Sequence, residues 1–160
     1  MAIHLVLYQP EIPQNTGNIM RTCAATGTRL HLIKPLGFSL ENKHIKRSGV
    51  NYIQETNYTT YENWNSFLEK NPKGYFYFCV PKASKNYAEI DFTDLEAELF
   101  IILGPESQVL PEAVLPNDSE SCFRIPMTDK VPVLNLSNAA ALLVYEALRQ
   151  QQFLDLWHVD

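Results

Sequence analysis

The apolar run at residues 99–103 (LFIIL) constrains the fold of this chain more than any other feature. No polar side chain interrupts it, and Gly104 and Pro105 follow directly. A continuous apolar strand that ends in a loop is typical of the centre of a parallel sheet, where helices cover both faces. The run therefore predicts a buried central strand whose carboxyl end opens onto a loop suited to binding a ligand.

Strands and helices are predicted to alternate along the rest of the chain. We expect further strands at 3–8, 30–33, 74–80 and 122–125, and helices at 15–27, 40–49, 61–69 and 137–151. Asn15, Thr16 and Asn18 offer capping side chains for the first helix, and Ser137 or Asn138 alone satisfies the last. The alternation predicts one α/β domain over residues 1–160, with a mainly parallel sheet flanked by helices.

Composition limits the class of protein. The 160 residues are 46% hydrophobic and 19% charged, which is typical of a globular domain that buries its own core. No apolar run reaches the roughly 18 residues that span a bilayer, so we expect no membrane segment. The first residues lack the features of a secretory signal, which predicts a cytoplasmic protein.

The cysteines and histidines are not spaced as metal ligands or as a redox pair. They stand apart along the chain: Cys23, Cys79 and Cys122, and His4, His31, His44 and His158. We therefore expect no metal site.

Charge is distributed unevenly. The chain carries a net charge of −5, yet one segment holds six basic residues against the single acidic residue Glu41. The six are Arg21, Arg29, Lys34, Lys43, Lys46 and Arg47. Such a segment is typical of a surface that binds phosphates, and a solvated surface of uneven charge explains it equally well.

Three polar loops follow predicted strands, at 10–21, 104–111 and 126–138, and we expect them to converge at one sheet edge. Neither a dinucleotide-binding nor a P-loop glycine motif is present, nor a serine-nucleophile elbow. In the first loop, Asn15, Asn18 and Arg21 suit an anion at a helix start, and simple capping is the alternative. In the second, Gly104 favours backbone contact with a ligand, whereas a plain turn would leave Glu106 in solvent.

Six motifs occur in the same order as in a known enzyme family. They are PEIPQNTGNIMR, HLIKPLGF, KRSGVNY, LGPES, FRIPMT and LNLSNAAALLVYEALRQ. Over nearly its whole length the chain resembles the SPOUT-class (SpoU/TrmH-like) tRNA ribose 2′-O-methyltransferases. It is most similar to the YibK/TrmL-like branch, which methylates the wobble nucleotide, a cytidine or uridine, of certain leucine tRNAs.

The resemblance implies a SPOUT fold, an α/β domain with a C-terminal deep trefoil knot. It also implies a homodimer that binds S-adenosylmethionine and the anticodon stem-loop of tRNA without a metal. The cofactor contacts, largely backbone groups, correspond to six positions in this chain. They are Phe78, Gly104, Ile125, Val133, Leu134 and Leu136.

The family's polar residues map onto two further sets. The resemblance places Arg21, Asn15 and Asn138 in catalysis. It assigns RNA binding to Arg21, Lys46, Arg47, Glu106, Arg124 and Ser137. Because an arginine resists deprotonation, we interpret Arg21 as a stabiliser of phosphate and of the developing alkoxide.

Two motifs depart from the family pattern. Val109 stands where the family has a glycine, and a positive φ there would strain a β-branched residue. Pro132 and Val133 replace an Arg-Ser pair, which removes a charge, a hydroxyl and a backbone N–H. The segment 79–82 also lacks the usual threonines. These departures leave two alternatives, a knotted RNA-binding dimer with weakened or lost methyl transfer and a 2′-O-methyltransferase for another RNA.

Overall fold

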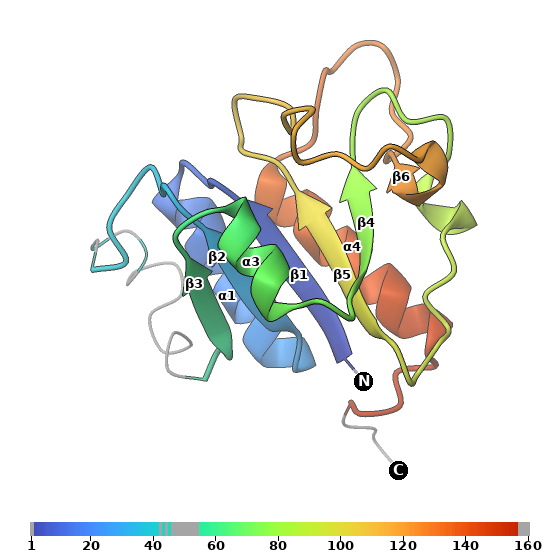
Figure 1. Ribbon diagram of the computed structural model, residues 1–160, viewed down its shortest axis with the longest axis horizontal. Coiled ribbons are helices and arrows are strands. Elements are labelled where there is room, and N and C mark those ends of the chain that lie inside the picture. The colour runs from blue at the N-terminus through green and yellow to red at the C-terminus, as the bar shows by residue number, and fades with distance from the viewer. Residues whose placement is uncertain (1, 42, 44, 46–54, 157–160) are drawn as a thin grey trace.

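Six parallel strands form the centre of the computed structural model, which describes residues 2–41, 43, 45 and 55–156. Their order across the sheet is β3-β2-β1-β5-β4-β6 (Figure 1). The strands are β1 Ala2–Tyr8, β2 Arg29–Ile33, β3 Tyr58–Tyr61, β4 Tyr75–Cys79, β5 Glu98–Leu103 and β6 Cys122–Phe123. The helices are α1 Pro13–Thr26, α3 Trp64–Lys70 and α4 Leu136–Gln150, with short 3-10 turns at η1 Tyr87–Glu89 and η2 Ser119–Ser121. The predicted α/β fold with a parallel sheet is confirmed.

Helices cover both faces of the sheet, with α1 and α4 behind it and α3 in front (Figure 1). Because successive strand residues point to opposite faces, β5 contributes to two separate cores. Ile101 packs on the side of α1 and α4 with Leu5, whereas Ile102 packs on the side of α3 with Phe67. The strand predicted to be central is thus buried on both faces.

The segment around Tyr61 differs from its prediction. The helix expected at 61–69 begins only at Trp64, where Asn63 caps it by accepting a hydrogen bond from Ser66 N at 2.8 Å. Tyr61 instead ends β3, an edge strand that pairs with β2. The sequence YTTY at 58–61 is short and largely polar, so its strand character comes from pairing with β2.

Both long helices begin differently from what we predicted. In α1 the N-cap is Ile12, which makes no capping hydrogen bond with its side chain, and Pro13 occupies the first turn. In α4 the cap is Asn135, whose side chain accepts from Ser137 N at 2.9 Å and Asn138 N at 3.2 Å. Capping by Asn15, Thr16 or Asn18, and by Ser137 or Asn138, was therefore wrong.

The short helix predicted at 40–49 lies largely outside the described residues. Within the described part, no helix combines the length and apolar character needed to cross a membrane.

Candidate functional site

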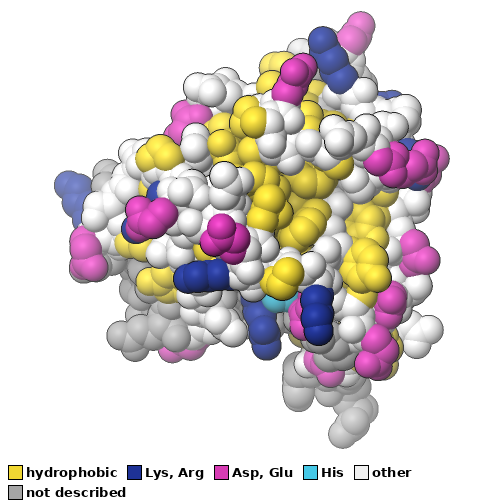
Figure 2. Space-filling model, in the orientation of Figure 1, with side chains coloured by type: hydrophobic (Ala, Val, Ile, Leu, Met, Phe, Trp, Pro, Cys, Tyr) yellow, Lys and Arg dark blue, Asp and Glu magenta, His cyan; other side chains and the backbone are white. Residues whose placement is uncertain are grey.

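A cavity of about 530 Å³ opens at the carboxyl edge of the sheet. Its walls come from the start of α1 and from the segments 79–81, 103–110, 124–127 and 132–136. Figure 2 shows hydrophobic side chains gathered over the carboxyl ends of β4 and β5. The expectation that a ligand site forms where β5 ends is thus matched by a cavity.

Glu106 joins the second polar loop to the first. One carboxylate oxygen of Glu106 accepts from Glu11 N at 2.7 Å, and the other accepts from Ile12 N at 3.1 Å. The second oxygen also accepts from Asn15 Nδ2 at 3.4 Å. The positive end of a helix dipole stabilises a negative charge near the helix N-terminus. Because α1 has no acidic residue in its first turn, Glu106 provides the negative charge at this position. A Glu106 left in solvent is therefore ruled out.

Glu11 returns the contact from the first loop to the second. Its carboxylate accepts from Ser107 Oγ at 2.6 and 2.8 Å, and from Ser107 N at 3.3 Å. Our sequence analysis missed Glu11, although it stands in the motif PEIPQN. Each of the two loops thus provides a carboxylate that accepts hydrogen bonds from the other loop.

The third loop is joined to the first through two amides. Asn135 Nδ2 donates to Asn15 Oδ1 at 3.0 Å, while the Asn135 side-chain oxygen caps α4. Asn15 is 7% exposed, and both ends of its amide are engaged. The predicted convergence of the three loops is confirmed, and Asn135 is a second residue that sequence reasoning did not assign to the site.

Most of the predicted cofactor residues line the cavity. Gly104, Ile125, Val133, Leu134 and Leu136 all do. A Cβ at Gly104 would lie 3.3 Å from Leu110 N, so the bare backbone lets the two segments approach closely. The side chain of Phe78 instead is buried, with its ring 6.1 Å from that of Trp64, and the cavity wall begins one residue later at Cys79.

The predicted catalytic and RNA-binding residues are more widely spread. Glu106 and Arg124 line the cavity together with Asn15. Arg21 lies on the exposed side of α1, about 9 Å along the helix axis from Asn15. Ser137 and Asn138 lie in the first turn of α4, outside the cavity lining. Lys46 and Arg47 fall outside the described residues.

The departure at Val109 carries no backbone strain. The non-glycine residues described with a positive φ are Gln9, Gln152 and Phe153, so Val109 does not adopt the left-handed conformation. Its side chain is 66% exposed at the cavity mouth. Our expectation of strain was wrong because the valine occupies an ordinary backbone conformation. Pro132 and Val133, by contrast, do form part of the wall.

The cavity holds a neutral thiol. Burial raises the pKa of Cys79 to about 12, and the pKa of the distant Cys23 likewise. Cys79 is therefore protonated near neutral pH and contributes an apolar surface. Among the described residues, no group of three or more His, Cys, Asp or Glu side chains is arranged to hold a metal ion.

Comparisons with known proteins agree with this architecture. Residues 2–145 match the model of the SpoU rRNA Methylase family. A tRNA (cytidine(34)-2′-O)-methyltransferase of Methylovorus glucosotrophus is 47% identical over 150 residues, which cover 93% of this chain and 96% of that protein. A protein of Geobacillus stearothermophilus assigned the same activity is 51% identical over 153 residues, covering 96% of this chain and 98% of the relative.

A solved structure is similar over the whole chain. The structure of a Bacillus anthracis protein assigned as an RNA methyltransferase superposes with a TM-score of 0.92 at 48% identity. The match covers 99% of this chain and 100% of that one. On the family match, the near full-length relatives and the shared fold, this chain belongs to the SpoU rRNA Methylase family.

Proposed function

We propose that this chain is an S-adenosylmethionine-dependent tRNA 2′-O-methyltransferase that acts in the cytoplasm. Its substrate is the ribose of the wobble cytidine or uridine in the anticodon stem-loop, in leucine tRNA. The observation that carries the proposal is the cavity built from three converging loops, in a chain matched along 93% of its length by a tRNA (cytidine(34)-2′-O)-methyltransferase.

The cavity suits a nucleoside cofactor of this kind. Its volume falls within the roughly 300–1,000 Å³ that small-molecule sites occupy. Ile125, Leu134 and Leu136 give it apolar walls, and Gly104 exposes backbone groups that can hydrogen-bond an adenine or ribose. When bound, S-adenosylmethionine supplies an electrophilic methyl group on sulfur.

The residues of the chain orient the RNA for transfer. The 2′-hydroxyl must be held in line with the methyl group, and the charge developing on its oxygen must be stabilised. Arg21 on α1 supplies the guanidinium for phosphate and alkoxide, and the exposed Asn138 supplies an amide for the ribose. Asn15 forms hydrogen bonds through both ends of its side-chain amide, and these bonds fix the start of α1 in the cavity wall.

The surface around these residues supports contact with the tRNA backbone. Arg124 and Glu106 lie in the cavity wall, and Ser137 lies at the start of α4. Lys46 and Arg47 extend the basic segment that begins at Arg21. Lysine and arginine contacts to phosphate provide affinity without reading bases, so this set positions the stem-loop.

The homodimer and the trefoil knot belong to the same proposal. Five hydrophobic side chains of the cavity lining are exposed, which supports their burial by a second copy. They are Val109 at 66%, Val133 at 50%, Ile12 at 43%, and Leu134 and Met127 at 38% each. Convergence of the 104–111 and 126–138 loops on one cavity supports the knot. Light scattering on the purified protein tests the dimer.

The test of the activity is methyl transfer to defined tRNA. The purified protein is incubated with methyl-labelled S-adenosylmethionine and unmodified leucine tRNA transcripts, with other tRNAs and ribosomal RNA as comparisons. We expect one 2′-O-methyl group at nucleotide 34, located by mass spectrometry of nuclease fragments. RNA binding without transfer would favour the RNA-binding dimer, and labelling of another RNA would favour a different substrate.

A further inference from the structure

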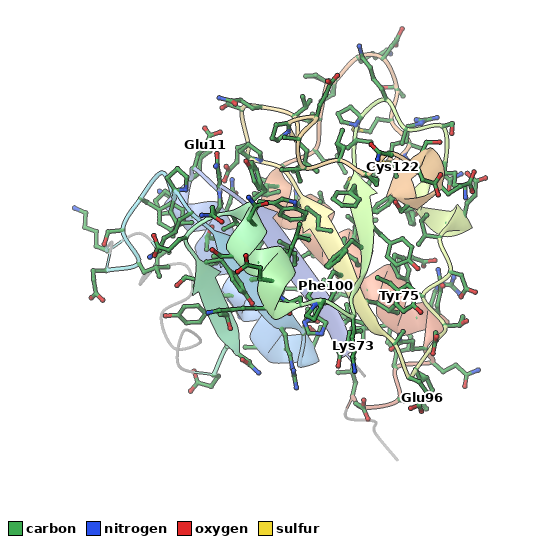
Figure 3. The ribbon with its side chains drawn as sticks, in the orientation of Figure 1. Glu11, Lys73, Tyr75, Glu96, Phe100 and Cys122 are labelled. Atoms are coloured by element: carbon green, nitrogen blue, oxygen red, sulfur yellow. The ribbon has the colours of Figure 1, made fainter. Side chains whose placement is uncertain are left out.

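Glu11 lies outside the cavity, yet it bonds a residue that lines it. Ser107 is part of the cavity wall, whereas Glu11 is not. The Ser107 hydroxyl donates to the carboxylate of Glu11, with its Oγ 2.6 Å from one carboxylate oxygen and 2.8 Å from the other. Figure 3 labels Glu11 in the loop that follows β1, beside the loop that follows β5. Its side chain therefore contacts the cavity wall from outside the cavity.

The contact is reciprocal, and this fixes the spacing of the two loops. Glu106 accepts from Glu11 N while Glu11 accepts from Ser107 N and Oγ. Hydrogen bonds to a charged group are stronger than neutral ones, and their loss leaves a desolvated partner behind. Two such bonds in opposite directions hold the backbone at 11–12 and at 106–107 in one relative position.

We propose that Glu11 is a positioning residue of the cofactor cavity. Through Ser107 it holds the wall at 104–108 against the start of α1. The proposal rests on the proposed function only in taking S-adenosylmethionine as the occupant of the cavity. Because α1 also carries Arg21, the same contact sets the distance between the cofactor wall and the helix assigned to the RNA.

The loop that carries Ser107 has a second anchor in the hydrophobic core. The far side of the loop is anchored independently, because Leu110 and Val114 are buried in the core on the side of α3. Glu11 is partly exposed and Ser107 is exposed, so neither is part of the buried core. Loss of the Glu11 carboxylate therefore loosens the wall at Ser107, while Glu106 still holds the backbone at 11–12 and the sheet remains folded.

The experiment compares Glu11→Ala with Glu11→Gln. The alanine removes the acceptor of Ser107, whereas glutamine keeps one oxygen acceptor without the charge. We expect Glu11→Ala to raise the Kd for S-adenosylhomocysteine, measured by calorimetry, about tenfold. Glu11→Gln should stay within about threefold of the wild type, which identifies the hydrogen bond as the cause.

The double variant tests whether the effect passes through Ser107. Ser107→Ala alone also touches the cavity, so its own Kd serves as the reference. Adding Glu11→Ala to Ser107→Ala should change that Kd by less than about twofold, because the contact has already been lost. An additive tenfold loss would overturn the proposal.

A readout without cofactor separates this proposal from the proposed function. Amide hydrogen exchange of Glu11→Ala should be faster at 104–108 and unchanged in β5. The matched control is Glu112→Ala, which removes an exposed carboxylate from the same loop and should leave the exchange at 104–108 unchanged. Unchanged exchange in Glu11→Ala overturns the role of Glu11, whereas a wild type that neither binds the cofactor nor transfers methyl overturns the proposed function alone.

Discussion

His4 Nδ1 lies 2.8 Å from His31 Nε2 on one buried face of the sheet. His4 Nε2 contacts the carboxylate of Glu98, and His31 Nδ1 lies 2.8 Å from the Tyr61 hydroxyl. The four residues come from β5, β1, β2 and β3 and form a continuous polar path on the side of α3. Phe100 stacks on His4 with ring centroids 4.1 Å apart, and both histidines and Tyr61 are buried, whereas Glu98 at the end of the path is partly exposed.

When both imidazoles are neutral, the hydrogen bonds along the path can be arranged in only one way. The carboxylate of Glu98 can only accept, so His4 Nε2 donates and His4 Nδ1 must accept from His31 Nε2. His31 Nδ1 then accepts from the Tyr61 hydroxyl. Protonation of His4 alone would reverse the path, with His31 Nε2 accepting from His4 Nδ1 and His31 Nδ1 donating to the Tyr61 hydroxyl. Protonation of both imidazoles would set two N–H groups against each other at the His4–His31 contact, so the path persists only while at least one of the two is neutral.

This arrangement predicts that the protein is less stable in mild acid. Burial lowers the pKa of His31 to about 3, and the neighbouring His4 and Arg29 lower it further. Burial also lowers the pKa of His4, although the hydrogen bond to Glu98 acts in the opposite direction. Because the unfolded histidine takes up a proton near pH 6.5, stability is complete above that pH and falls as the pH decreases toward 3. At pH 5 we expect His31 to account for a loss of about 2 kcal/mol relative to pH 7, measured by urea unfolding.

The matched variant for this prediction is His31→Asn, which removes the titrating group. It should be less stable than the wild type at pH 7 but should show a smaller change between pH 7 and pH 5. Burial raises the pKa of Glu98, but the contact with His4 outweighs it and leaves that pKa below its ordinary value. The range from pH 5 to pH 7 lies above that ordinary value, so this carboxylate contributes little to the slope. An identical slope in the variant would show that the acid sensitivity arises elsewhere.

Arg21→Ala should abolish methyl transfer without affecting the cofactor. The residue lies on the exposed side of α1 and not in the cavity wall, so the Kd for S-adenosylhomocysteine should stay within about twofold of the wild type. Loss of a stabilising donor at a developing anion reduces kcat by about a hundredfold or more. Single-turnover methylation of tRNA measures the rate.

Arg21→Lys is the companion variant, because it retains the charge but not the planar pair of donors. We expect a rate between those of the wild type and the alanine variant. Full activity in Arg21→Ala would refute the role of the guanidinium.

Asn135→Ala should destabilise the protein by about 1–3 kcal/mol. The change removes the cap of α4, which alone is worth about 1 kcal/mol, and the hydrogen bond to Asn15. Asn135→Asp separates the two effects, since the aspartate still caps the helix but cannot donate to Asn15. Thermal unfolding should rank the wild type above Asp, and Asp above Ala. Equal values for Asp and Ala would mean that the cap contributes nothing.

Val109→Gly should lower the stability of the protein or leave it unchanged. The backbone of Val109 is not left-handed, so glycine gains nothing in the folded state and adds conformational freedom to the unfolded chain. We expect a loss of up to about 1 kcal/mol by chemical denaturation. Stabilisation by the glycine would indicate that residue 109 needs a positive φ after all.

Much of the fold follows from local sequence, because burial and periodicity are local signals. The apolar run in β5 and the apolar face of α4 predicted their elements to within about two residues. The start of α1 was misplaced because its N-terminal anion comes from Glu106, which is 95 residues from Glu11. The edge strand β3 was missed because only its pairing with β2 makes a strand of YTTY.

The site was predictable in outline and not in its contacts. Three loops after three strands indicated where the cavity forms, and Gly104 and Ile125 line it as expected. The partners of Glu11 and Asn135 could not be inferred, since an acid and an amide in polar loops are equally compatible with solvent. The pairing of His4 with His31 is likewise invisible in a sequence where the two residues are 27 positions apart.

The hydrogen bond between Asn15 and Asn135 joins residues 120 positions apart, and this has a consequence for biosynthesis. A growing chain can form β1, α1 and β2 early, but the cavity lacks a wall until the segment 132–136 has left the ribosome. Contacts between such distant positions form late in folding because a long loop must first close. The cavity can therefore enclose a ligand only after the segment 132–136 has been synthesised and has docked against the start of α1.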